Sequence, residues 1–214
     1  MAKVSHGYGT HLSQPRTVMN AIEFFQMSEG IWRSHRITHH LLLRRSESGN
    51  TEIEVKVLAP DDPKVIEICQ LHTVQPEQAI GGCFVQWKGT MAWDRDEEDT
   101  HQGSTVFVLV PDNRHSGQLL RERGYAENIP VIGQYQVDAH NGLVLTTEYD
   151  TMSSQERFWF ANPNLRLRTT TVKSLGGFNT TSFCAESKLS ALTPPSSPAT
   201  TADALIPAHS WLGW

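Results

Sequence analysis

The feature of this sequence that most constrains its fold is an alternation of apolar and polar residues at period two, which recurs along most of the chain. It is clearest in TEIEVKVL (51–58), GCFVQWKGTMAW (82–93), GSTVFVLVP (103–111), LVLTTEY (143–149) and ERFWFA (156–161). Such alternation predicts β-strands with one buried face. Five further strands are expected at 33–44, 118–126, 131–138, 165–173 and 178–188. The chain is therefore predicted to be all-β, with about ten strands.

Short turns join many of these segments. Turn-forming residues occur in AHNG (139–142), NPN (162–164) and GG (176–177). Short strands joined by tight turns describe an up-and-down antiparallel sheet, which leaves exposed edges unless it closes on itself. We therefore expect a barrel, and a barrel of eight or more strands has an interior wide enough for a small ligand.

Two short helices interrupt the strand pattern. Asn20 followed by Glu23 has the spacing of a capping box and predicts a helix over 20–29. Two aspartates before Pro63 predict a second helix that ends near His72. The apolar residues expected on the helix faces are Ile22, Phe25 and Met27 in the first helix and Val65, Ile66, Cys69 and Leu71 in the second.

Composition excludes several classes of protein. Charged residues make up 19% of the 214 residues and the formal net charge is -5, with both signs interleaved, so no nucleic-acid partner is expected. The three cysteines are far apart and show neither zinc-site spacing nor a disulfide framework, which favours a reducing compartment and no metal. The chain lacks a signal-peptide pattern and an apolar run of roughly 20 residues, so we expect a soluble, intracellular protein without a membrane partner.

The chain is expected to consist of one domain with two tails. Residues 1–18 are rich in Gly, Ser, His and Thr, and residues 190–214 are rich in Pro, Ser, Thr and Ala. Both compositions are typical of disordered extensions. The domain itself is predicted to span 19–189.

One strand carries an aromatic face. In 82–93 the residues of one parity are Cys83, Val85, Trp87, Met91 and Trp93, with Gly89 among them. Two tryptophans with a glycine between them can stack on a flat conjugated ligand, or they can fill the barrel core. Taken alone, the strand favours core packing.

Other strands carry charged faces. Arg166, Arg168 and Thr170 share one parity, as do Arg36, Thr38 and His40, while His39 has the opposite parity. An inward arginine implies an acidic ligand or a neighbouring carboxylate, although a solvated outer face fits the alternation equally well. Glu186 shares the parity of Cys184 and could also face inward, where a carboxylate requires hydrogen-bond donors.

Six segments carry a resemblance to a known family. They are EFFQMSEGIWRSHRITHHL, GTMAWD, HQGSTVFVLVPD, LLRERGYAE, TEYDTMSSQERFWFANPNLRLRTTTVK and GGFNTTSFCAESK. In this order they resemble the S-type (CpcS/CpeS) phycobiliprotein chromophore lyases over about residues 19–189. The resemblance implies a ten-stranded barrel like that of lipocalins and fatty-acid-binding proteins, which binds phycocyanobilin or a related open-chain bilin, such as phycoerythrobilin, as substrate. The lyase attaches the bilin through a thioether to a cysteine of a phycobiliprotein apo-subunit.

The same resemblance implies the site residues. The chromophore-handling positions are Trp32, Arg36, His39, Trp87, Trp93, Arg166 and Glu186, with Arg168 as a neighbour of undefined role. Because Arg36 and His39 differ in parity, both reach one pocket only if the strand bulges or one of them lies at the rim.

The chemical groups of a bilin suggest a role for most of these residues. Arg36 and Arg166 are expected to pair with the two propionates, and Trp87 and Trp93 to pack against the conjugated rings. Glu186 is the expected catalytic residue, because a carboxylate that accepts pyrrole N–H groups favours a protonated, more electrophilic bilin. The nucleophile is the thiolate of the client protein.

The expected partners are therefore the bilin and the apo-subunit, with a homodimer or a heterodimer with a related lyase subunit as possible assemblies. No prosthetic cofactor is expected, and the implied compartment is the cyanobacterial cytosol, or the plastid stroma in an alga. Two alternatives stay open: a non-catalytic lipocalin-type carrier of a bilin or fatty acid, and an assembly partner that binds the apo-subunit without pigment.

Overall fold

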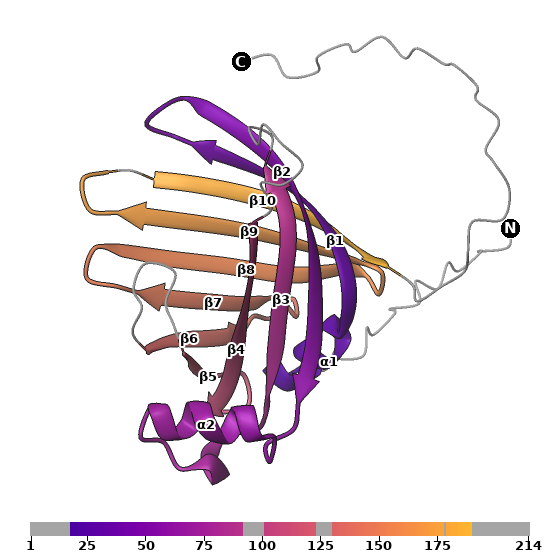
Figure 1. Cartoon of the computed structure of the whole chain (residues 1–214), viewed down its shortest axis with the longest axis vertical. Helices are drawn as coiled ribbons and strands as arrows, with labels where there is room; N and C mark the ends of the chain where they lie inside the picture. The colour runs from indigo at the N-terminus through magenta and orange to yellow at the C-terminus, as the bar shows by residue number, and fades with distance from the viewer. Residues whose placement is uncertain (1–17, 92–100, 123–129, 178, 190–214) are drawn as a thin grey trace, which may run out of the picture.

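The computed structural model describes residues 18–91, 101–122, 130–177 and 179–189. In these ranges ten antiparallel strands close into one barrel, in which each strand pairs with its neighbours in sequence and the last pairs with the first (Figure 1). The strands are β1 (Gly30–His40), β2 (Arg45–Leu58), β3 (Gly82–Met91), β4 (His101–Pro111), β5 (Ser116–Arg121), β6 (Val131–Val137), β7 (Leu143–Glu148), β8 (Met152–Asn162), β9 (Leu165–Ser174) and β10 (Asn179–Leu189). The predicted all-β, up-and-down, ten-stranded barrel is confirmed.

Some strand bounds differ from the predicted ones. β2 begins at Arg45 rather than at residue 51, because its first residues continue the hairpin with β1 beyond the barrel core, where exposure hides the alternation. β8 begins at Met152 rather than at residue 156, because its first residues pair with β7 and β9. The inward residue Ser154 is buried but polar, so no apolar alternation marks this part of the strand. The expected tails, apart from Val18, lie outside the described residues.

Helix α1 (Ala21–Ser28) closes one end of the barrel (Figure 1). The expected capping box is present: the Glu23 backbone N–H donates to the Asn20 side chain at 2.9 Å, and the Asn20 N–H donates to the Glu23 carboxylate at 2.7 Å. Phe24 and Phe25 pack into the barrel core, whereas Met27, expected on this face, is 40% exposed. The helical period places residues 24, 25 and 28 together and turns residue 27 outward.

Helix α2 (Pro63–Leu71) lies outside the barrel, and a 3₁₀ turn, η1 (Pro76–Gln78), follows it. Its buried residues are Val65, Ile68 and Cys69. Leu71, expected on this face, is instead exposed. The buried residues cover Val106, Val108 and Leu120 on the outer surface of β4 and β5. Because β4 is buried by the barrel core on one face and by α2 on the other, VFVLV is a continuous apolar run rather than an alternation.

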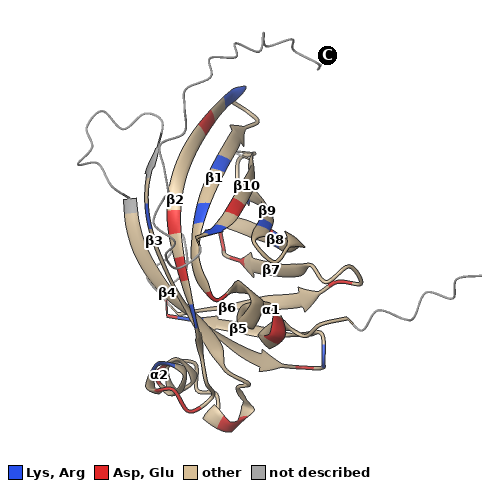
Figure 2. Cartoon of the chain, turned by 90° about the vertical axis from the view of Figure 1, so that its right-hand side faces the viewer, with Lys and Arg blue, Asp and Glu red and all other residues tan. Residues whose placement is uncertain are grey.

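The end of the barrel opposite α1 is formed by turns. The Leu41 N–H donates to Asn179 O at 3.1 Å, and the Leu175 N–H donates to Thr151 O at 2.8 Å. These bonds join the β1–β2, β9–β10 and β7–β8 turns, which lie along one side in Figure 1. Figure 2 shows Lys or Arg and Asp or Glu interspersed over β1, β2, β9 and β10. Within the described ranges, no helix is long and apolar enough to cross a membrane.

Candidate functional site

A cavity of about 650 Å³ occupies the barrel between α1 and the turns of the opposite end. This volume lies in the range of small-molecule sites, roughly 300–1,000 Å³. Its apolar lining includes Phe24, Phe25, Ile53, Val55, Val85, Trp87, Phe107, Leu143, Leu145 and Phe158. Its charged lining, among the described residues, is Arg36, Arg166, Arg168, Glu156 and Glu186. The cavity is therefore mostly apolar, with one concentrated charged region.

The register of β1, β10, β9 and β8 builds the charged region. Glu186 on β10 lies directly between Ser34 on β1 and Arg166 on β9. The neighbouring inward row contains Arg36, Cys184 and Arg168 in the same strand order. Cross-strand partners on one face have Cβ atoms about 5 Å apart, so antiparallel pairing alone brings these charges together.

Glu186 and Arg166 form a buried ion pair. Arg166 Nε donates to Glu186 Oε2 at 2.6 Å, and the two side chains are 6% and 0% exposed. The guanidinium carbon lies 4.8 Å from the Trp32 ring centroid and 5.6 Å from that of Phe158. Stacking on two aromatic faces favours a cation and fixes its plane. The pair is thus a rigid element of the cavity wall.

Arg168 connects this pair to a second carboxylate. Its Nη2 lies 3.3 Å from Glu186 Oε1, and its Nη1 donates to Glu156 Oε1 at 3.3 Å. Thr170 also donates to Glu156 at 3.3 Å. Arg166 and Arg168 therefore face inward and have glutamates beside them. Glu156 was missed at the level of sequence, although its parity with Phe158 and Phe160 in ERFWFA places it on the buried face.

Trp32 supports the site from behind. Its ring is fully buried, its Nε1 donates to Ser28 O at 2.7 Å, and its centroid lies 6.0 Å from that of Phe160. Trp32 does not belong to the cavity lining. It joins α1 to the back of the Arg166 guanidinium, so the structure gives it a positioning role.

The structure separates Arg36 from His39. Arg36 lines the cavity, and its partner on β2 is Gly49, which adds no side chain to the space beside it. The register of β1 is regular on both sides and contains no bulge, so parity alone decides the orientation. His39 is exposed on the outer face of the barrel. It does not meet Arg36 in the cavity.

Trp87 lines the cavity, as its strand parity predicts, together with Cys83, Val85 and Gly89. The indole lies over Gly103, its partner on β4. A Cβ added at Gly103 would lie 2.5 Å from the Trp87 Cζ2 atom. The glycine therefore gives the indole a flat surface on which to lie. Trp93 lies outside the described residues.

We expect Gly103→Ala to displace the Trp87 ring, because overpacking of a filled space forces side chains off their rotamers. The variant should bind the bilin that the family resemblance implies about three- to tenfold more weakly. Titration of the variant with bilin, followed by absorption, measures the change. The control is Gly177→Ala, at a turn far from the cavity where an added Cβ meets nothing within 4 Å but the backbone φ of +82° is unfavourable for Ala. This variant should lose stability without losing bilin affinity, so it separates a general loss of stability from a change at the indole. Equal affinity of Gly103→Ala and wild type would show that the position of the indole is unimportant.

The described cysteines are all free and buried. Cys83 lines the cavity, and burial raises the pKa of its thiol far above the ordinary value. Burial also raises the pKa of the thiol of Cys69, which lies on the inner face of α2. Because the thiolate is the nucleophile, Cys83 is held in its unreactive form.

The comparisons with known proteins agree with this geometry. A family model described as "CpeS-like protein" matches residues 20–189. The chain belongs to the CpeS-like family. A relative from Picosynechococcus, named phycocyanobilin lyase subunit CpcS, is 56% identical over 197 residues, which are 91% of this chain and 98% of the relative. A chromophore lyase CpcS/CpeS 2 from Trichodesmium erythraeum is 58% identical over 80% of this chain and 88% of its own length.

A solved structure shares the fold of this CpeS-like chain. The S-type phycobiliprotein lyase CPES from Guillardia theta superposes with a TM-score of 0.72 at 34% identity, over 81% of this chain and 95% of that protein. The family resemblance noted from the sequence is thereby confirmed.

Proposed function

We propose that this CpeS-like protein binds an open-chain bilin in the barrel cavity and attaches it through a thioether to a cysteine of a phycobiliprotein apo-subunit. The observation that carries the proposal is the mixed charge of a largely apolar cavity, in which three arginines and two glutamates face the interior. The names of the relatives support the same activity. Phycocyanobilin is the bilin favoured by the name of the 56% identical relative.

A bilin fits this cavity better than a fatty acid. Both ligands carry carboxylates that arginines can bind. A fatty acid at neutral pH, however, has no donor for the buried carboxylate of Glu186, whereas the pyrrole rings of a bilin carry N–H groups. A carboxylate offers about four acceptor positions, and the described contacts of Glu186 with Arg166, Arg168 and Ser34 use three. A position is left for a pyrrole N–H.

The roles of the cavity residues follow from the contacts that each side chain already makes. Arg36, at the less buried side of the charged region, pairs with a propionate, and Trp87 packs on a ring. Arg166 donates to Glu186 through its Nε and lies over the Trp32 and Phe158 rings, so it acts on the pigment chiefly by fixing the carboxylate, with Arg168 beside it. Glu186 then stabilises the protonated, electrophilic bilin. This assignment gives Arg166 less direct contact with the propionates than its sequence position alone implies.

The assembly follows from the same proposal. The client is the phycobiliprotein apo-subunit, and the compartment is the one where that subunit is made, the cytosol of a cyanobacterium or the stroma of a plastid. The name of the Picosynechococcus relative includes the word subunit. It supports the proposal that this chain acts as a homodimer or together with a related lyase chain.

The test is a reconstitution. The purified chain is mixed with phycocyanobilin and an apo-phycobiliprotein subunit, and the products are separated after denaturation in acid. We expect bilin bound covalently to the client at a rate well above that of a reaction without this chain. We expect no covalent bilin on the chain itself, because its cavity cysteine is kept as a thiol.

Other outcomes would contradict the proposal. A shift in bilin absorption without transfer to any client tested indicates a carrier. Binding of the client without any change in bilin absorption indicates an assembly partner.

A further inference from the structure

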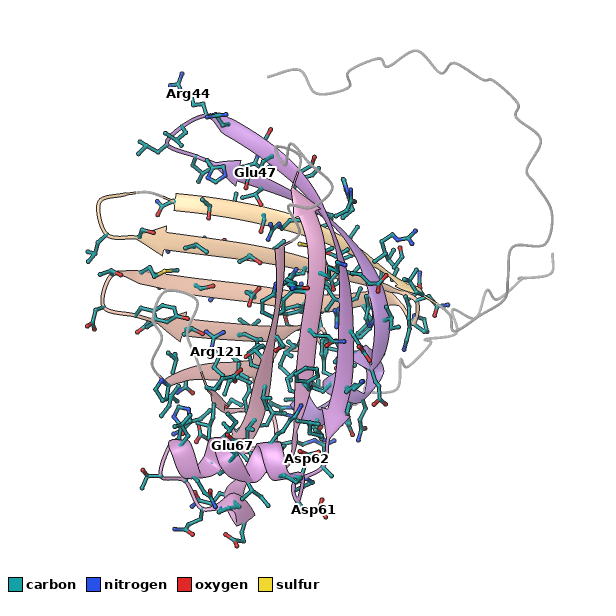
Figure 3. The ribbon with its side chains drawn as sticks, viewed as in Figure 1. Arg44, Glu47, Asp61, Asp62, Glu67 and Arg121 are labelled. Atoms are coloured by element: carbon teal, nitrogen blue, oxygen red, sulfur yellow. The ribbon has the colours of Figure 1, made fainter. Side chains whose placement is uncertain are left out.

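At the β1–β2 turn end of the barrel, a histidine and a carboxylate lie next to the cavity but do not belong to its lining. His40 is the last residue of β1 and shares the inward parity of Arg36. Its Nε2 lies 3.1 Å from Glu47 Oε2 on β2, and the side chains are 31% and 20% exposed. Figure 3 labels Glu47 near the β1–β2 turn, whose tip is marked by Arg44, far from Asp61 and Asp62 beside α2. The pair is therefore at the end of the barrel opposite α2.

The register places the pair at the end of the cavity wall. Ser182 lines the cavity and lies opposite Thr38. In the next inward row Val172 still lines the cavity, and its partner Thr180 lies opposite His40. Inward rows along a strand are about 7 Å apart. A group held at His40 is thus close to the cavity, yet open to a protein that docks on the barrel end.

We propose that His40, oriented by Glu47, is the general base that accepts the proton of the client thiol during transfer. The inference rests on the proposed lyase function, which requires the client cysteine to reach the cavity mouth. With Nε2–H donated to the carboxylate, the tautomer is fixed and Nδ1 is the acceptor. A base that is itself oriented by a third group in this way recurs beside activated nucleophiles.

The step is balanced within the site. Nδ1 of His40 takes the proton as the sulfur forms a bond to the exocyclic ethylidene carbon of the bilin. The carbon–carbon π bond breaks, and its electron pair takes up a proton at the adjacent ring carbon. The imidazolium returns the proton, so the thiol hydrogen ends on the ring and nothing is oxidised or reduced.

The charged groups around His40 are few among the described residues. On β2 they are Glu47 and Arg45, which is the register partner of His40, and on β1 the nearest inward charge is Arg36. The facing residues of β10, Thr180 and Ser182, do not titrate. Two arginines near the mouth also favour a thiolate once it has formed.

The experiment measures the single-turnover transfer rate of wild type and His40→Gln at two pH values. A cysteine with an ordinary pKa of about 8.5 is roughly one tenth thiolate at pH 7.5 and mostly thiolate at pH 9.5. We therefore expect His40→Gln to transfer about tenfold more slowly at pH 7.5 and at nearly the wild-type rate at pH 9.5. The affinity and absorption of bound bilin should stay unchanged.

Two further variants make the result specific. His35→Gln changes the outward histidine of the same strand, which contacts Asn50 at 3.0 Å, and is expected to match wild type. His40→Ala should regain rate at pH 7.5 on addition of imidazole. Equal transfer rates of wild type and His40→Gln at pH 7.5, or an equal loss of rate at both pH values, would show that His40 is not the general base. Wild type that transfers no bilin at either pH contradicts the lyase function instead.

Discussion

Glu186→Gln is expected to slow bilin transfer by about 100-fold while leaving bilin affinity within a few-fold of wild type. General acid or base groups contribute on the order of 10²–10⁴ to a rate. The amide keeps the shape of the side chain but loses the charge that stabilises a protonated bilin. The more positive cavity still attracts the propionates. The absorption band of the bound pigment should therefore shift, and the shift is measured in the same titration.

The same variant should be less stable. Arg166, which is 5% exposed, loses the carboxylate that compensates its charge. Loss of one partner of a buried ion pair costs roughly 3–5 kcal/mol, and we expect the low end because Gln can still accept one hydrogen bond. Urea denaturation of the free protein measures the loss.

A double variant separates stability from chemistry. Glu186→Gln combined with Arg166→Gln removes both charges of the pair and should recover part of the unfolding free energy, since no uncompensated cation is left at Arg166. It should not recover the transfer rate. If Glu186→Gln alone transferred bilin like wild type with an unchanged spectrum, Glu186 would have no activating role.

Trp32→Ala should lower the free energy of unfolding by about 3–5 kcal/mol, the usual range for removal of a fully buried tryptophan. The variant loses the contact with Phe160, the hydrogen bond to Ser28 O, and the ring behind Arg166. These contacts hold α1 against the barrel. Loss of bilin affinity in this variant should be accompanied by loss of stability.

Trp87→Ala is the matched comparison, because this ring lines the cavity and is only partly buried. Loss of ring stacking, worth about 1 kcal/mol, should weaken bilin binding roughly fivefold. Its unfolding free energy should fall much less than that of Trp32→Ala. If Trp87→Ala lost the stability and Trp32→Ala lost only bilin affinity, the positioning role of Trp32 and the contact role of Trp87 would both be wrong.

Features that depend on a few neighbouring residues could be predicted from the sequence. Strand alternation, the Asn20 capping box and the Pro63 helix start are local patterns, and all three are present in the structure. The inward direction of Trp87 followed from the parity of its strand. The strand bounds could not be predicted at 45–50, where the hairpin end is largely exposed, or at 152–155, where the buried inward residue Ser154 is polar. Neither stretch has the apolar face that marks a strand in the sequence.

The arrangement of the site was decided only by the tertiary structure. Alternation shows that Arg166 and Arg168 share one face of their strand. It does not show whether that face points to the barrel interior or to solvent, so it could not tell an inward arginine from an outward one. Barrel closure pairs β10 with β1 and β9, and this register sets Glu186 between Ser34 and Arg166. The same regular register turns His39 outward and puts Trp32 behind the cavity wall. Because register links strands that lie far apart along the chain, no local pattern contains it.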